Sequence, residues 1–153
     1  MSQKKTTDLE KILENVNADQ FDEFQKTYRN ELIESGDSLV VYFRELLQEK
    51  HLTQQQVFLR ADVPERYGYK LLSGEKRTRQ RDVILRLCYA AQLSLEETQK
   101  FLRMYELPEL YVKIPRDALL MIVFNEHNLN IIEINELLKG KGFEPLRTSG
   151  VQD

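Results

Sequence analysis

The amino-acid sequence predicts an all-α fold, in which a five-helix domain carries N-terminal helices and an extra C-terminal helix pair. Two observations lead to this prediction. Apolar residues recur at intervals of three and four along most of the 153-residue chain, which is the period of an amphipathic helix, and alternating strand patterns are scarce. The four prolines, at positions 64, 108, 115 and 145, fall at the borders of these stretches, where helices tolerate them.

The first part of the chain is expected to contain two helices, at 7–16 and 18–34, because apolar side chains form one stripe in each. Gly36 is expected to end the second helix. Ser38 is suited to cap the next helix, whose apolar stripe includes Phe43 and its neighbours one turn away.

The middle of the chain predicts two short helices joined by a tight connector. Thr53 is a good N-cap for a helix at 54–60, and residues 61–63 form the connector. The helix at 64–73 has a proline in its first turn, and Gly74 ends it in the left-handed conformation that glycine tolerates. A basic loop follows at residues 75–79.

The second half of the chain contains a weak internal repeat. A helix is predicted at 80–92, and Ser94 with Glu97 forms the capping box of another that runs to about residue 105. The segment 81–102 resembles 116–138 at an offset of 35 and then 36 residues. We therefore expect a second helix pair that stacks on the first in solenoid fashion.

This layout divides the chain into four parts. They are an N-terminal helical extension, a central domain, a C-terminal helix pair packed on it and a flexible tail, at residues 1–36, 37–106, 107–146 and 147–153.

Charge is distributed unevenly along the chain. The net charge is −3, but residues 51–86 carry eight basic and four acidic side chains. The flanking segments, 1–50 and 87–153, are both acidic. A basic segment inside an acidic chain is the local electrostatic footprint that a nucleic-acid-binding surface leaves.

Residues 52–74 resemble the helix-turn-helix of the lambda-repressor/Cro-type family of bacterial transcriptional regulators. The resemblance rests on Leu-Thr-Gln at 52–54, Val57, Val63 and Leu-Leu-Ser-Gly at 71–74, and it extends over about residues 38–101. It implies that the helix at 64–73 lies in the major groove of double-stranded DNA, while the preceding helix directs its N-terminus at a phosphate.

Under this resemblance Arg66 is expected to bind guanine, and Glu65 to accept a hydrogen bond from cytosine. Three cations after the helix are expected beside the phosphates, which gives a salt slope near ~−2.7. The expected DNA contacts are Thr53, Gln54, Gln55, Glu65, Arg66, Tyr67, Tyr69, Lys70, Lys76, Arg77 and Arg79.

Other interpretations of these residues stay open. Residues 54–56 could be only a polar helix start, and Tyr67 and Tyr69 could be packing residues. Arg77 and Arg79 could instead pair with acidic groups of the N-terminal segment.

The chain departs from the family pattern at three positions. Phe58 replaces a small residue, Asp62 replaces the connector glycine, and Gly68 replaces a branched apolar residue. Aspartate tolerates the left-handed conformation, so the second change is mild. The large Phe58 side chain is expected to fill the space left at Gly68. Whether the three departures abolish DNA binding is left open by the sequence.

We expect no enzymatic activity, because the sequence contains no glycine-rich phosphate loop, no nucleophile elbow and no zinc-binding His-Glu-x-x-His pattern. We expect no cofactor and no metal, because the two histidines, 51 and 127, are far apart and instead suit helix C-termini. Cys88 is expected to be a small buried apolar residue. With no apolar run long enough for a membrane span and no signal peptide, the expected location is the cytoplasm.

The expected function is sequence-specific regulation of transcription. The apolar residues of 107–146 exceed what two helices can bury between themselves, so they cover either the first repeat or a second protomer. A homodimer through the C-terminal helices is therefore expected as a partner state. The main alternative is an antitoxin-like or signalling adaptor, in which the helix-turn-helix is a scaffold for a protein partner. A peptide-sensing regulator is a further alternative.

Overall fold

The computed structural model describes residues 6–29, 31–32 and 38–148, and this part of the chain contains nine α-helices and no strand. The predicted all-α class is thus confirmed. The chain forms two compact units, Met1–Ser35 and Gly36–Asp153, each described by itself below. None of the helices in the described ranges is long and apolar enough to cross a membrane.

The N-terminal unit contains α1 (Thr6–Leu13), a 3₁₀ turn at Ala18–Gln20 and α2 (Phe21–Thr27). Both predicted helices were too long. The first ends at Leu13, after which i→i+3 hydrogen bonds replace the α-helical pattern. The second ends at Thr27, and the carbonyl of the following Tyr28 accepts turn hydrogen bonds from the backbone of Glu31 and Leu32. The predicted stop at Gly36 lies outside the described residues.

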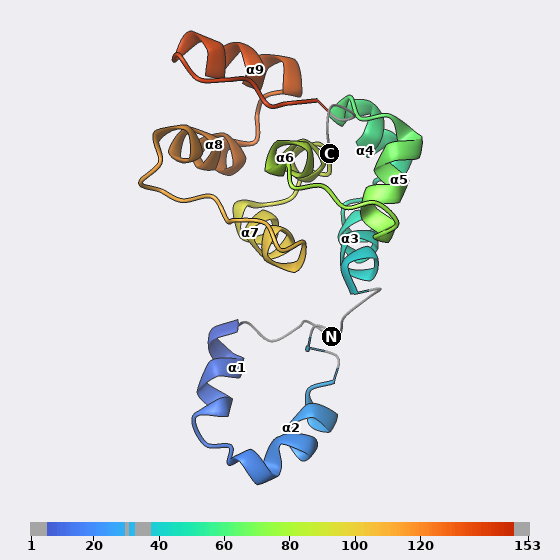
Figure 1. The fold of residues 1–153 in the computed structure, drawn as a ribbon, viewed down its shortest axis with the longest axis vertical. Helices are drawn as coiled ribbons and strands as arrows, with labels where there is room; N and C mark the ends of the chain where they lie inside the picture. The colour runs from blue at the N-terminus through green and yellow to red at the C-terminus, as the bar shows by residue number, and fades with distance from the viewer. Residues whose placement is uncertain (1–5, 30, 33–37, 149–153) are drawn as a thin grey trace. The chain divides into compact units, whose positions relative to one another are not determined.

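The larger unit consists of seven helices, shown in Figure 1. They are α3 (Ser38–Glu49), α4 (Gln54–Ala61), α5 (Glu65–Ser73), α6 (Arg81–Ala90), α7 (Leu95–Met104), α8 (Pro115–Glu126) and α9 (Ile131–Gly140). Ser38 is the first residue of α3, and the position that would cap this helix is not among the described residues.

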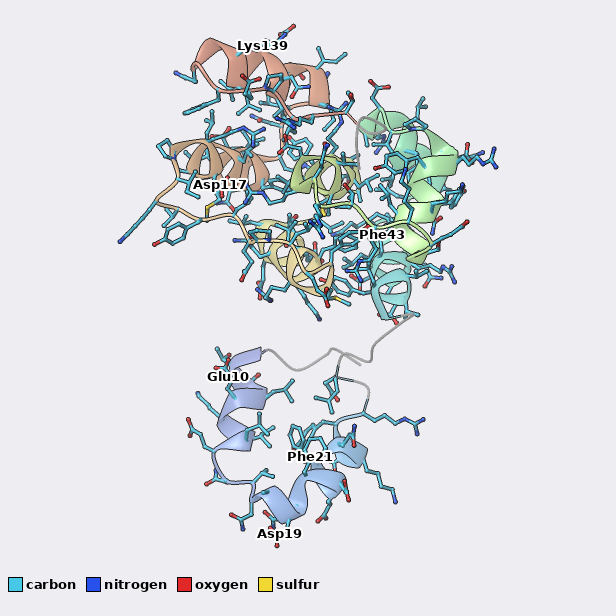
Figure 2. All side chains as sticks on the ribbon, viewed as in Figure 1. Glu10, Asp19, Phe21, Phe43, Asp117 and Lys139 are labelled. Atoms are coloured by element: carbon cyan, nitrogen blue, oxygen red, sulfur yellow. The ribbon has the colours of Figure 1, made fainter. Side chains whose placement is uncertain are left out.

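Helix α6 lies at the centre of this unit, with α4, α7 and α9 packed against it (Figure 1). Every residue of α6 from Val83 to Ala90 is buried, including Arg86 and the thiol of Cys88. Burial raises the pKa of the Cys88 thiol, so Cys88 is an apolar core residue as predicted. One continuous apolar cluster runs from Phe43, labelled in Figure 2, to Leu146.

The internal repeat is visible in equivalent contacts 36 residues apart. The side chain of Ser94 caps α7 together with Glu97, and that of Asn130 caps α9 together with Glu133. The amide side chain of Gln99 on α7 binds the backbone of Leu110. Its counterpart Asn135 on α9 accepts a hydrogen bond from the backbone N–H of Leu146. Each helix pair is therefore closed by a loop that returns to its second helix.

The two pairs are joined by crossed ion pairs at the starts of α6 and α8. The guanidinium of Arg81 binds both carboxylate oxygens of Asp117, at 2.6 and 3.0 Å. The guanidinium of Arg116 binds Asp82 in the same way, at 3.0 and 3.2 Å. Asp117, labelled in Figure 2, is only 1% exposed. These bidentate contacts fix how the second pair stacks on the first.

The apolar side chains of the C-terminal helices cover the first repeat. Leu120, Val123 and Phe124 of α8 and Ile134 and Leu138 of α9 all belong to the continuous core. Ile122 and Ile132 remain exposed. The excess of apolar residues in 107–146 is thus accounted for largely within one chain, and the homodimer stays a prediction.

Candidate nucleic-acid interface

The N-terminus of α4 is held by a complete capping box, which confirms Thr53 as its N-cap. The hydroxyl of Thr53 accepts a hydrogen bond from the backbone N–H of Gln56, and the Gln56 side chain accepts one from the N–H of Thr53. Gln54 and Gln55 follow in the first turn, where backbone N–H groups point out of the helix without an intrahelical acceptor. The helix therefore presents an anion-binding end to solvent.

A three-residue turn joins α4 to α5. Asp62 adopts the left-handed conformation with φ 54° and ψ 48°, as its replacement of glycine requires. Val63 is buried and its N–H binds the carbonyl of Phe58 at 3.0 Å. Pro64 has an extended ψ of 132°, so it caps α5 instead of lying in its first turn, and α5 begins at Glu65. Gly74 ends the helix with φ 80°.

Phe58 and Gly68 fit together across the α4–α5 contact. A Cβ atom on Gly68 would lie 2.3 to 2.8 Å from atoms of the Phe58 ring, which is closer than any real contact. The ring of Phe58 is 1% exposed, and Tyr69 packs edge-on against it with centroids 5.0 Å apart. The two departures from the family pattern therefore compensate each other, as the sequence predicted.

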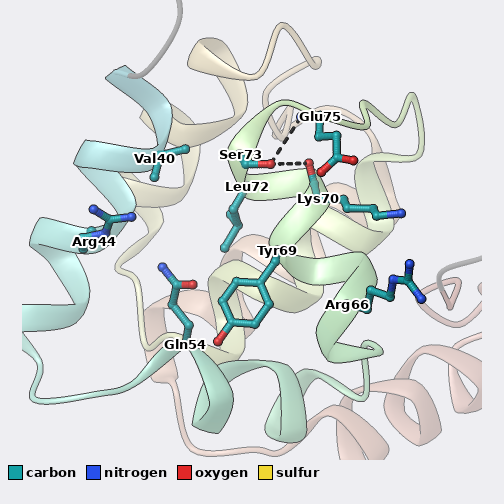
Figure 3. A pocket seen from close by; sticks show the side chains of 9 residues that line it. All are labelled: Val40, Arg44, Gln54, Arg66, Tyr69, Lys70, Leu72, Ser73 and Glu75. Carbon is teal, nitrogen blue, oxygen red and sulfur yellow. Dashed lines mark hydrogen bonds between the residues drawn. The ribbon is translucent and has the colours of Figure 1, made fainter.

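Four predicted contact residues meet in one shallow hollow between α3, α4 and α5, shown in Figure 3. The hollow has a volume of about 320 Å³. Gln54 lines it from the start of α4, while Arg66, Tyr69 and Lys70 line it from α5. The rest of its wall comes from Val40, Arg44, Leu72, Ser73 and Glu75.

The hollow is cationic. Arg44 and Arg66 are exposed and Lys70 is half-buried. Within the described part of the chain, the ion pairs found in the structure involve none of these three side chains. Glu75, the one acidic residue of the wall, makes a backbone hydrogen bond to Ser73. In Figure 3 Tyr69 points toward Gln54, with Arg44 on the same side, while Arg66 and Lys70 extend from the other side of α5.

Five residues of this wall were not predicted from the sequence, of which Arg44 is the only cation; the five are Val40, Arg44, Leu72, Ser73 and Glu75. Arg44 lies on α3, for which no DNA contact was predicted from the sequence. Its position one turn after Val40 gives a face of α3 that turns toward α5 (Figure 3). This helical spacing is the only signal in the sequence that could have identified Arg44.

Two cations of the basic loop after α5, Lys76 and Arg77, contact other side chains of the same unit. Arg77 donates a hydrogen bond to the carbonyl of Tyr105 at 2.9 Å, stacks over its ring and lies 4.0 Å from the carboxylate of Glu106. Its partners are thus at the end of α7 and not in the N-terminal segment. The ammonium of Lys76 lies over the ring of Tyr67, which is half-buried against the core.

The remaining predicted contacts, Gln55, Glu65 and Arg79, are exposed. Glu65 is the first residue of α5, so its carboxylate lies at the positive end of the helix dipole. The structure thus brings Gln54, Arg66, Tyr69 and Lys70 together, and places Arg77 against α7.

The histidines do not form a metal site. No group of three or more His, Cys, Asp or Glu residues able to hold a metal occurs in residues 6–29, 31–32 and 38–148. His127 caps the end of α8 with φ 52° and stacks on Tyr89 with centroids 4.2 Å apart. His127 is thus the C-cap residue of α8, as predicted, and burial lowers its pKa, which favours the neutral imidazole over a cation.

The surface formed by α3, α4 and α5 can bind an extended anion through the guanidinium groups of Arg44 and Arg66, the ammonium of Lys70 and the amide of Gln54. Comparison of the chain with family models, with curated proteins and with solved structures finds no match.

Proposed function

We propose that this chain is a sequence-specific DNA-binding transcriptional regulator of the lambda-repressor/Cro helix-turn-helix type, with α5 as the reading helix. The observation that carries the proposal is the cationic hollow, where Arg66 and Lys70 of α5 and Gln54 of α4 share one solvent-exposed surface. Two helices joined by a three-residue turn with a left-handed Asp62 suit this family's geometry.

Binding follows from how the two helices present their polar groups. The exposed N-terminus of α4 receives a DNA phosphate, with the Gln54 amide as an additional donor. α5 then lies in the major groove, where Arg66 forks onto a guanine and Glu65 accepts from a cytosine. Tyr69 contacts a thymine methyl or a sugar, and Lys70 neutralises a phosphate.

The proposal is tested with labelled random duplex DNA at about 50 mM and about 200 mM salt. Two or more phosphate contacts predict a slope of about −1.8 or steeper, so the affinity falls roughly tenfold between these conditions. Selection from the same pool then yields a preferred sequence. The proposal fails if the folded protein binds no duplex at the lower salt concentration.

Single substitutions distinguish base-specific recognition from nonspecific electrostatic binding to DNA. Arg66→Ala is expected to cost about 1–3 kcal/mol at a single base position, because only that guanidinium reaches the base edge. Lys139→Ala, at an exposed position on α9, is the matched control and leaves both affinity and preference unchanged. Equal binding by the parent and Arg66→Ala would show that Arg66 reads no base.

A protein-interaction adaptor is the second candidate. It is favoured by the engagement of Arg77 with the end of α7 and by the exposure of Tyr69, Tyr111 and Val112. In this case the helix-turn-helix serves as a scaffold, and the tyrosines contact a protein partner. A folded chain that binds no DNA at low salt, with Tyr69→Ala reducing capture of a defined partner, supports this function instead.

A further inference from the structure

Arg86 makes a connection that neither the sequence nor the DNA-binding proposal uses. It lies in the middle of α6 and is 2% exposed. Its Nε donates to the carbonyl of Ala61, the last residue of α4, at 2.9 Å. Its Nη1 donates to the carbonyl of Leu146 at 2.9 Å, and its Nη2 lies 3.8 Å from the carboxylate of Asp62. One buried guanidinium thus holds both the α4–α5 turn and the C-terminal loop.

The second repeat has a neutral residue at the position equivalent to Arg86, which is Met121 of α8. In the first repeat, moreover, the carbonyl of Leu110 is bound by Gln99 of the same repeat. The equivalent carbonyl, that of Leu146, is bound by Arg86 instead. The Arg86 guanidinium therefore connects the α4–α5 turn to the loop that follows α9.

The loop that Arg86 holds is fixed from several sides. Arg116 donates to the carbonyls of Glu144 and Pro145. The carboxylate of Asp82 accepts from the backbone N–H of Arg147, and Asn135 accepts from that of Leu146. After α9 the chain thus returns toward α4, as Figure 1 shows. Its hydrogen bonds hold the carbonyl of Leu146 in place as the acceptor for Arg86.

We propose that Arg86 is a positioning residue, which uses the C-terminal loop 144–147 as a fixed support to set the α4–α5 turn and hence the orientation of α5. The left-handed Asp62 is the direct target, since Arg86 binds the carbonyl before it and faces its carboxylate. The second helix pair then contributes to DNA binding, because its C-terminal loop helps to set the orientation of α5. The effect of Arg86 on DNA binding rests on the proposed function, whereas its effect on the α4–α5 turn does not.

The test is Arg86→Met, which copies the residue of the second repeat, measured by amide hydrogen exchange in the full chain. The N–H groups of Asp62 and Val63, which bond to carbonyls of α4, are expected to exchange at least tenfold faster. Amides in the middle of α7 are expected to keep their protection. Arg86→Lys keeps one donor in place of the guanidinium fork, so it should restore part of the protection.

DNA binding is the second readout. The affinity of folded Arg86→Met for duplex DNA is expected to fall about tenfold with an unchanged salt slope, because no phosphate contact is removed. Arg103→Met, which removes an exposed arginine paired with Glu109, is the control and should alter neither readout. If Arg86→Met does not fold, Arg86→Lys is compared with the parent in the same two measurements.

The outcomes distinguish the two proposals. Unchanged exchange at Asp62 and Val63 overturns the role of Arg86, whether or not the protein binds DNA. Unchanged DNA affinity of a folded variant that exchanges faster also overturns it, since the turn would then not orient α5. A parent protein that binds no DNA overturns the proposed function, while the exchange data still decide whether Arg86 sets the turn.

Discussion

The contact between Phe58 and Gly68 shows how one residue determines what its neighbour can be. Gly68→Ala places a methyl group inside the Phe58 ring, and such overpacking costs about 1–3 kcal/mol, offset by about 1 kcal/mol of helix preference. Phe58→Ala alone leaves a cavity and costs about 3–5 kcal/mol. We expect the double variant to be less destabilised than the sum of the single ones, as measured by urea unfolding.

A coupling free energy of about 1–3 kcal/mol between the two positions would agree with the compensation. Strict additivity would contradict it, because the methyl group at position 68 would then not meet the ring at position 58.

His127 gives the molecule a pH dependence of stability. Because burial lowers its pKa from the ordinary value near 6.5, the folded state binds a proton less readily than the unfolded state. Its contribution is therefore fully present above pH 6.5, and it is lost as the pH falls below that value and through the lower pKa of the folded state. We expect Tm to drop between about pH 7.5 and about pH 5.5, and to drop less in His127→Asn.

Asparagine is the suitable replacement because it tolerates the left-handed backbone at this position. An equal drop in both proteins would show that His127 is not responsible.

At the scale of elements, capping residues allowed helix starts to be predicted from the sequence. The starts of α4 and α7 were predicted from Thr53 and Ser94, whose side chains accept a hydrogen bond from the backbone N–H three residues later. Asn130 caps α9 in the same way, although this cap was not predicted from the sequence. The N-terminal helices were predicted too long because apolar spacing continues past Leu13 and Thr27, where turn hydrogen bonds replace the regular α-helical pattern. Periodicity describes a face, and it does not by itself mark where a helix ends.

The crossed ion pairs connect the elements of the two repeats. Asp117→Asn removes the charge that neutralises Arg81 at a nearly fully buried carboxylate. We expect a loss of about 3 kcal/mol, at the lower end for a broken buried pair because Arg81 is one-fifth exposed. Chemical denaturation measures this loss.

Glu109→Gln, which breaks the exposed pair with Arg103, is the control and should cost no more than about 1 kcal/mol. If the two substitutions cost the same, the crossed pairs do not hold the repeats together.

At the scale of the whole molecule, the continuous core from Phe43 to Leu146 predicts that the larger unit unfolds as one. Helices α4 and α9 both pack on α6, so neither can lose its contacts without exposing the same core. We expect amides in the middle of α4 and of α9 to exchange with the same opening free energy under conditions where global unfolding dominates. A clearly lower value for α9 would mean that the second pair opens by itself.

The arrangement of the binding surface was predictable only where it is local. The turn and the outward face of α5 follow from residues within 20 positions of one another, and Gln54, Arg66, Tyr69 and Lys70 do meet. The place of Arg77 depends on Tyr105, 28 residues away, and no local pattern reveals such a contact. For the same reason the sequence did not show that Arg86 reaches both Ala61 and Leu146.

The burial of α6 on every side has a consequence for how this protein can diverge. From Val83 to Ala90 the helix has no solvent-facing side, so every substitution there must be accommodated by a neighbouring element. We expect descendants of this chain to change α6 only in concert with α4, α7 or α9, while the exposed positions of α5 can change independently.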